Sequence, residues 1–164
     1  MREASRLTFE GDMKKKKPRI RPLAICVFRN QDRILVAEGY DSVKEEYFYR
    51  PLGGAIEFGE WSVETICREL MEEIQAEVDQ ESLKYLGTVE NIFHFNGDPG
   101  HEIVLIYDGL LKNSKLYEQA VISGQEANGE DVRAVWKDID EFGKEKSTLY
   151  PTGLVEILGA KTST

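Results

Sequence analysis

The hydrophobic positions in the first part of the chain follow the pattern of β-strands. Apolar runs over residues 23–29 and 34–37 are separated by turn-forming residues at 30–33, and this arrangement predicts a β-hairpin. Residues 41–49 are polar and aromatic, which indicates a loop leading into a strand. Proline and two glycines within residues 50–54 then interrupt regular structure. The first third of the chain is therefore predicted to be mainly β.

Residues 62–75 carry the clearest helical pattern. Ser62 can act as the N-cap, because its hydroxyl can accept a hydrogen bond from a free backbone N–H of the first turn. Four apolar residues recur at helical spacing and form one stripe: Val63, Ile66, Leu70 and Ile74. The spacing predicts an amphipathic helix that packs on a core.

The remaining pattern predicts more strands and a closing helix. The expected strands cover residues 83–90, 103–111 and 132–137, a turn of helix is expected at 139–142, and a terminal helix at 149–158 with Pro151 near its start. This order of elements predicts an α+β fold, an α/β/α sandwich in which helices flank a mixed β-sheet.

The chain length and its ends define the expected domain. The 164 residues suffice for one domain with a substantial core. We place this domain at residues 20–160, between a flexible tail at 1–19 and a short tail at 161–164. Met13 can be the natural start, with residues 1–12 as an added extension, and the lysines at 14–17 are interpreted as part of a solvated tail.

Charge and cysteine content narrow the function classes. The net charge of −9 argues against a long nucleic-acid partner, because binding a phosphate backbone usually needs a basic surface. A small phosphorylated substrate stays compatible with it, since metal ions can neutralise carboxylates and phosphates together. Cys26 and Cys67 form neither a metal-ligand spacing nor a disulfide framework, and no apolar run is long enough to span a membrane. We therefore expect a cytoplasmic protein.

The predicted helix also carries a cluster of acids. Glu69, Glu72 and Glu73 are three and four residues apart and share one helix face, and the apolar stripe is expected to point away from all three. Like charges at this spacing repel each other, so a compensating charge is expected. Arg68 can fork across carboxylates, and divalent cations would compensate better.

A glycine loop precedes this helix. Gly53 and Gly54 let the backbone approach a ligand closely, and their carbonyl groups can coordinate a hard cation. Oxygen ligands of this kind suit Mg²⁺ or Mn²⁺. Cations held between the loop and the helix could polarise a phosphorus centre and activate water, with a carboxylate as proton acceptor.

The full spacing of these residues resembles a known motif. Gly54 is followed after five residues by Glu60, after seven more by Arg68-Glu69-Leu70, and after one more by Glu72-Glu73. Residues 54–76 thus resemble the Nudix box of the Nudix hydrolase superfamily, to which the bacterial MutT proteins belong. One position departs, because Gln75 stands where the motif has glycine. Gln75 can adopt the left-handed conformation of that glycine only at a cost of about 1 kcal/mol, or the helix can run slightly longer, so we expect a changed helix exit there, with the chemistry kept.

The resemblance implies an α/β/α sandwich and a pyrophosphohydrolase that uses Mg²⁺, or Mn²⁺ as a substitute. Its substrate would be a nucleoside diphosphate linked to another group, a small nucleotide derivative. The resemblance assigns the metal to the Gly53 carbonyl and to Glu69, Glu72 and Glu73, with Arg68 orienting the carboxylates. Glu60 matches a residue that either supports the loop–helix junction or binds an outer metal. Many family members are dimers, so a homodimer is one expected state.

Family members often add a later acid whose position varies. Glu126 is the favoured candidate for this further ligand or base, because it lies in a Gly/Asn-rich stretch, residues 123–130, just before a predicted strand. Glu130 lies in the same stretch, and Glu102 is a third candidate.

The substrate-side signals are weaker. Arg50, beside the glycine loop, is a candidate phosphate contact, and the backbone at Gly54 can approach the substrate. Phe48, within the aromatic run 47–49, is our candidate for stacking on a base, and residues 93–95 form a second aromatic cluster with the same alternatives of base stacking or core packing. His94 and His101 can contact phosphate or lie at the surface.

Two other functions remain open at this stage. The chain can be a non-catalytic nucleotide-binding or regulatory module on the same scaffold, because folds host unrelated functions. It can also be an enzyme of the same superfamily with another substrate, either an isopentenyl-type isomerase or a hydrolase of RNA ends.

Overall fold

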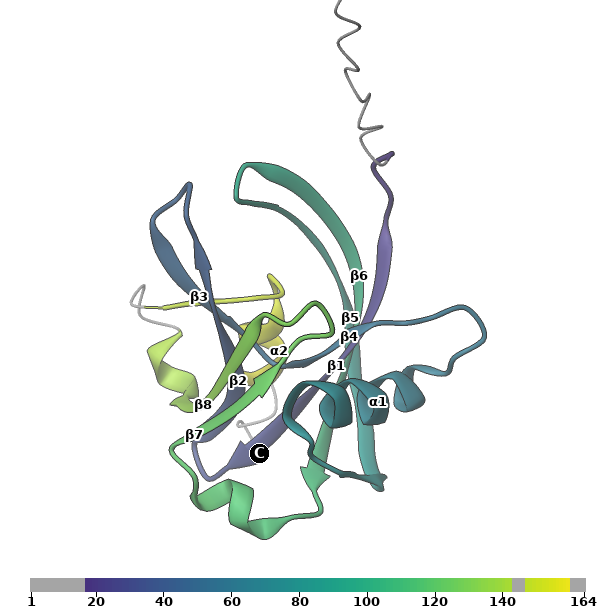
Figure 1. Cartoon of the computed structure of the whole chain (residues 1–164), viewed down its shortest axis with the longest axis vertical. Coiled ribbons are helices and arrows are strands. Elements are labelled where there is room, and N and C mark those ends of the chain that lie inside the picture. Colours follow the sequence, from purple (N-terminus) through teal and green to yellow (C-terminus); the bar gives the residue numbers. More distant parts are fainter. Residues whose placement is uncertain (1–16, 143–146, 160–164) are drawn as a thin grey trace, which may run out of the picture.

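The computed structural model describes residues 17–142 and 147–159 (Figure 1). The elements in these ranges are β1 (Arg21–Asn30), β2 (Arg33–Asp41), β3 (Glu46–Arg50), β4 (Leu52–Ala55), α1 (Ser62–Ile74), β5 (Val78–Phe95), β6 (Asp98–Leu111), the 3₁₀ turn η1 (Ser114–Glu118), β7 (Val121–Gln125), β8 (Asp131–Asp138), the 3₁₀ turn η2 (Ile139–Glu141), β9 (Thr148–Leu149) and α2 (Leu154–Gly159).

Strand β1 is the centre of the sheet. It pairs in parallel with β6 over residues 21–28 and antiparallel with β4 over residues 23–26, but with β2 only at its end, where Arg29 faces Ile34. Beyond that point β2 pairs with β3 and β8. The strands therefore form two arms that diverge from the β1–β2 hairpin, one ending in β5–β6 and the other in β2–β3 (Figure 1). The predicted hairpin and the mixed sheet are confirmed.

The alternation of side chains along β1 builds two cores. Ala24, Cys26 and Phe28 pack with α1, whereas Leu23, Ile25 and Val27 pack with α2. All six are at most 3% exposed, as expected for a central strand covered on both faces. The fold is thus a mixed sheet with a helix on each side, in agreement with the predicted class.

Two strands, β5 and β6, are longer than expected, and β4 and β7 were not predicted: β4 forms over Leu52–Ala55, where regular structure was expected to be interrupted. β5 and β6 form a hairpin closed by Asn96 and Gly97, whose φ values of 50° and 85° suit a two-residue turn. Its outer half is polar on one side, so the hydrophobic pattern there is weak. β7 occupies residues that were predicted to be loop, and only residues 126–130 connect it to β8. The strand lacks a strong apolar run because only Ile122 is buried.

The closing helix is shorter than predicted. It begins at Leu154, and Leu149, the first residue of the expected helix, instead belongs to β9 (Thr148–Leu149), which pairs in parallel with β3. Tyr150 donates its backbone N–H to the Tyr49 carbonyl at 2.8 Å, and the residue before a proline disfavours the helical region. Pro151 therefore precedes the helix and does not start it.

The predicted tails lie mainly outside the described residues. Residues 1–16 and 160–164 are outside the described ranges, while residues 17–19 are exposed and have no regular structure. The domain limits of 20–160 stay a prediction. In the described part of the chain, no helix is both long and apolar enough to cross a bilayer.

The N-cap residue of helix α1 lies one position earlier in the sequence than expected. Trp61 holds the N-cap position, and Glu64 accepts a hydrogen bond from its backbone N–H at 2.9 Å. The Ser62 hydroxyl instead lies 2.7 Å from the Tyr107 hydroxyl. The prediction of Ser62 as N-cap is therefore wrong, because Tyr107 on β6 engages the side chain.

The exit of α1 keeps the geometry that glycine would give. Gln75 has φ 54° and ψ 35°, which is the left-handed region. The Gln75 N–H bonds to the Met71 carbonyl at 3.1 Å, which is the bond of the αL capping motif, and the Ala76 N–H bonds to the Leu70 carbonyl at 3.2 Å. The expectation of a changed exit is wrong, since glutamine here adopts the conformation required of glycine.

We predict that Gln75→Gly raises the free energy of unfolding by about 0.5–1 kcal/mol, because glycine adopts positive φ without the Cβ penalty. Urea unfolding followed by circular dichroism measures this change. Gln75→Ala is the control, since it removes the same side chain but keeps the Cβ, and it should give no gain. Equal stability of the two variants would contradict the assignment of strain to Gln75.

Candidate active site

The glycine loop is fixed against the central strand. Gly53 pairs with Ile25 and Gly54 with Ala24. Gly53 has φ +145°, and a Cβ on it would lie 2.2 Å from the Ala24 carbonyl oxygen, so only glycine fits. A Cβ on Gly54 would lie 2.4 Å from the Glu69 carboxyl carbon. The Glu69 carboxylate therefore lies directly on the loop backbone.

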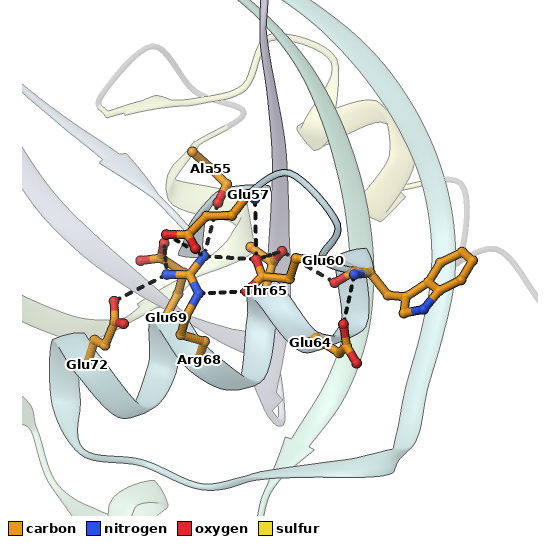
Figure 2. A network of polar contacts seen from close by, with 9 residues as sticks. Ala55, Glu57, Glu60, Glu64, Thr65, Arg68, Glu69 and Glu72 are labelled. Atoms are coloured by element: carbon orange, nitrogen blue, oxygen red, sulfur yellow. Dashed lines mark hydrogen bonds and ion pairs between the residues drawn. The ribbon is translucent and has the colours of Figure 1, made fainter.

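Arg68 is the hub of the acidic cluster (Figure 2). Its guanidinium group donates to both oxygens of Glu60, at 2.7 and 2.9 Å, and to Glu69 at 2.8 Å. It also reaches Glu72 at 3.2 Å and the Ala55 carbonyl at 3.1 Å. These contacts, first of all those to Glu60, raise the pKa of Arg68 further above its ordinary value. One arginine thus ties helix α1 to the loop and sets the positions of three carboxylates.

Both oxygens of Glu60 are held within the loop–helix junction. Besides the two bonds from Arg68, the carboxylate accepts from the Thr65 hydroxyl and from the Glu57 N–H. The hydrogen bonds from Arg68, followed by the one from Thr65, lower the pKa of Glu60 to about 2. This geometry favours the junction role of Glu60 over the outer-metal role.

Glu73 is buried, unlike the two other acids of the box. It is 6% exposed, and burial, followed by the charges of Glu126 and Glu69, raises its pKa to about 8, with Arg50 opposing the shift. The prediction that the apolar stripe points away from all three carboxylates is therefore wrong for Glu73. Its position is seven residues after Ile66, which places the two only about 20° apart around the helix.

Glu126 reaches this cluster from the other arm of the sheet. The loop after β7 is closed by two backbone hydrogen bonds, from Glu126 N–H to the Glu130 carbonyl at 2.7 Å and from Gly129 N–H to the Glu126 carbonyl at 2.9 Å. Of the three later acids, Glu126 is the one whose charge raises the pKa of Glu73. Glu130 and Glu102 line the adjoining pocket.

A pocket of about 370 Å³ opens between the two arms of the sheet. The predicted substrate residues Arg50 and Phe48 line it, as do Glu126 and His94. The size suits a small organic ligand. Arg50 and Glu126 line the pocket and their charges act on Glu73, so the pocket adjoins the acidic site.

Aromatic rings form part of the pocket wall. The ring centroid of Phe48 lies 5.6 Å from that of Phe95 and 5.7 Å from that of Tyr150, and Phe93 lies 6.3 Å from Tyr150. Tyr150 was not predicted as a pocket residue, because it is 102 residues from Phe48 in the sequence and no motif marks it. The short strand β9 delivers it to the pocket.

Other candidates lie elsewhere. Tyr49 is in the core, 8% exposed, and Tyr47 is an exposed residue whose ring lies 4.9 Å from that of Tyr40. His101 lies 2.6 Å from Glu90 and does not line the pocket. Phe48 and His94 therefore line the pocket, whereas Tyr47, Tyr49 and His101 do not.

The donor set fits a hard divalent cation. Glu69 offers carboxylate oxygens beside the Gly54 backbone, and the side chain of Glu73 is hydrogen-bonded to that of Glu69. Oxygen ligands are those that Mg²⁺ and Mn²⁺ prefer. Burial is the main cause of the raised pKa of Glu73, and the repulsion from Glu126 and Glu69 that adds to it is relieved by positive charge at this point. In the described ranges, no three acidic, histidine or cysteine side chains already surround one point as ligands. Binding therefore requires side-chain rearrangement, most directly of Glu69 and Glu72, which Arg68 now engages.

Comparisons with known proteins agree with this geometry. The family model described as the NUDIX domain matches residues 18–153. A NUDIX hydrolase from Nitrosomonas europaea is 16% identical, with a TM-score of 0.59 over 88% of this chain and 90% of that one. A MutT NUDIX hydrolase from Burkholderia pseudomallei is 16% identical, with a TM-score of 0.58 over 89% and 99%. A structure described as an ADP compounds hydrolase is 16% identical, with a TM-score of 0.54 over 89% and 74%. No curated protein sequence matches the chain.

The chain belongs to the NUDIX family, since the family model covers most of its length. It is an enzyme of the hydrolase class that cleaves phosphoanhydride bonds. The likeness to the solved structures, at 16% identity, establishes the shared fold.

The carboxyl end of α1 depends on a close contact with β7. A Cβ on Gly124 would lie 1.7 Å from the Glu73 carbonyl oxygen, too close for any side chain. We predict that Gly124→Ala lowers the free energy of unfolding by about 2–3 kcal/mol and also lowers kcat, because the helix end that carries Glu73 must move. Gly87→Ala is the control, since its nearest contact would be 3.5 Å. Thermal unfolding and hydrolysis rates measure both effects, and full activity of Gly124→Ala would contradict the coupling.

Proposed function

We propose that this protein uses Mg²⁺, or Mn²⁺ as a substitute, to hydrolyse the pyrophosphate bond of a nucleoside diphosphate linked to another moiety. The observation that carries the proposal is the buried Glu73. Its charge is disfavoured by burial and by its neighbours Glu126 and Glu69, and it lies beside a pocket of nucleotide size. A buried carboxylate kept among like charges is typical of a functional site.

The residues divide into metal ligands and supporting groups. Glu69, Glu72, Glu73 and the Gly53 carbonyl would hold the cation. When bound, a divalent cation supplies positive charge that polarises the phosphorus centre and assists ionisation of the attacking water. Arg68 orients the carboxylates, and Glu60 supports the junction through its bonds to Arg68 and Thr65.

Glu126 is proposed as the later acid. It approaches the helix from the β7–β8 loop and is the acid outside the box whose charge acts on Glu73. A carboxylate there can accept the proton of the attacking water. Glu130 and Glu102 line the pocket and are assigned no part in the proton transfer.

Arg50 and Phe48 are proposed to bind the substrate. Arg50 lines the pocket next to the acidic cluster, where its charge acts on Glu73, so it is placed to contact phosphate. Phe48 lies further along the same strand, two residues away, and offers a ring for base stacking. The Gly54 backbone, which carries no side chain, lets phosphate approach.

We also propose a cytoplasmic, small-molecule enzyme. The net charge of −9 supports a small nucleotide derivative over a long nucleic acid. A homodimer is the state to test by light scattering.

The test is a substrate screen. Nucleoside diphosphate sugars, dinucleotides and nucleoside triphosphates are incubated with Mg²⁺, with Mn²⁺ or with chelator, and released phosphate and nucleoside monophosphate are measured. We expect metal-dependent release of nucleoside monophosphate from at least one linked diphosphate. Binding of nucleotides by calorimetry without turnover of any compound would overturn the proposal in favour of a binding module.

A further inference from the structure

Three polar side chains form a row across one wall of the pocket. Glu102 on β6 faces Arg21 on β1 and Asn91 on β5 in the registers of the two strand pairs. All three line the pocket between the arms. The adjacent row is apolar, with Leu23 beside Val104, so the polar row is confined to one level of the wall.

The buried side chain of Glu102 has few polar contacts within the protein. Its residue is 4% exposed, and its charged partner, Arg21, lies 3.9 Å away with a side chain that is 50% exposed. Among residues 17–142 and 147–159, no group donates a hydrogen bond to its carboxylate. Because no buried side-chain oxygen or nitrogen of the described residues lacks a hydrogen-bond partner, the oxygens of Glu102 are open to the pocket, where a ligand can donate to them.

Asn91 is also buried and fixed in place. It is 3% exposed, and its Oδ1 accepts the Thr152 N–H at 3.2 Å. With the amide oxygen engaged, the amide nitrogen has no acceptor within the described part of the chain. The row therefore presents a carboxylate acceptor between two donors, the guanidinium of Arg21 and the amide of Asn91.

The distance between the polar row and the Gly53–Gly54 loop is similar to the length of a nucleoside. Gly54 pairs with Ala24, which is three residues along β1 from Arg21, so the separation along the strand is about 10 Å. A nucleotide whose phosphates lie at the glycine loop can thus place its base at this row. The rings of Phe93 and Phe48 line the same space.

We propose that Glu102, with Arg21 and Asn91, selects substrates whose base carries a ring N–H beside a carbonyl group. This inference rests on the proposed function. Guanine and uracil present a ring N–H to the carboxylate and a carbonyl oxygen to a neighbouring donor. Adenine and cytosine bound in the same position present a ring nitrogen lone pair instead, which the carboxylate repels, and the ring must shift to bring its amino group to Glu102. The carboxylate only accepts hydrogen bonds, so rotation of the Glu102 side chain does not remove the mismatch in that position.

The test compares four substrates that differ only in the base. With Mg²⁺, kcat/KM is measured for the diphosphoglucose derivatives of guanosine, uridine, adenosine and cytidine. We expect the guanosine or uridine compound to exceed the adenosine and cytidine compounds by at least about tenfold. In Glu102→Gln, whose amide both donates and accepts, the ratio should fall below about threefold, mainly through KM. Absence of base preference, or the same preference in Glu102→Gln, would overturn the inference.

A control and a binding assay separate this inference from the proposed function. Glu90→Gln changes an exposed acid on the neighbouring strand that does not line the pocket, and it should keep the wild-type ratio. If no diphosphoglucose is hydrolysed, calorimetry with GMP, UMP, AMP and CMP decides. At least tenfold tighter binding of GMP or UMP, lost in Glu102→Gln, supports the role of Glu102, and equal binding of all four overturns it. Thermal unfolding of each variant checks that the fold is kept.

Discussion

Glu73→Gln should lower kcat by roughly a thousandfold while making the metal-free protein more stable at pH 8 and above. The loss of activity follows from removing one proposed metal-binding carboxylate. The gain in stability follows because the amide cannot ionise in a buried position next to Glu69 and Glu126. A residue needed only for folding would change both quantities in the same direction.

The sign of the pH effect can be derived from the pKa of Glu73. Burial and neighbouring charges raise this pKa from 4.5 to about 8, so between these values the folded state keeps a proton that the unfolded state has lost. Metal-free wild type therefore loses stability as the pH rises from 4.5 to 8, and it does not regain it above 8. In Glu73→Gln this contribution is absent.

Urea unfolding in chelator at pH 5, 7 and 8.5 measures this effect, and a substrate assay with Mg²⁺ measures kcat. Glu77→Gln is the control, since Glu77 is an exposed residue whose partner is Lys112, and it should keep both the activity and the wild-type pH profile. A Glu73→Gln variant with full kcat, or with the pH profile of the wild type, would refute the role of Glu73.

Arg68→Met should lower the free energy of unfolding by about 2–4 kcal/mol, because it leaves partly buried carboxylates without their shared cation. Glu60 and Glu69 have side chains that are each 15% exposed, so water compensates them only in part. Activity should fall as well, since the carboxylates lose the group that orients them. Arg68→Lys keeps the positive charge but lacks the planar set of N–H donors of the guanidinium group, so it should be more stable than Arg68→Met but less stable than the wild type.

The same substitution should change the acid limb of the stability curve. The bonds from Arg68 lower the pKa of Glu60 from 4.5 to about 2, so they stabilise the folded state above pH 4.5, and this stabilisation is lost as the pH falls toward 2. Unfolding measured between pH 2 and 6 should show a smaller pH dependence in Arg68→Met than in the wild type. Equal slopes would show that Arg68 does not set the pKa of Glu60.

The local pattern was sufficient for the parts of the fold that are built from neighbouring residues. The hairpin of β1 and β2, the span of α1 and the acidic motif follow from side-chain period, turn residues and spacing. The errors arose where a distant segment decides. Tyr107 engages Ser62, and β9 pairs with β3 in place of the first turn of the expected helix.

The sequence by itself determined the NUDIX motif and supplied the residues that we propose as cation ligands. Tertiary structure alone decided that Glu73 is buried, that the charge of Glu126 acts on it, and that Tyr150 lines the pocket. Arg21, Asn91 and Glu102 belong to three strands and form a row only through strand register. The physical reason is that burial and charge act through space, so the pKa of a carboxylate and the donors around it depend on segments far apart in the chain.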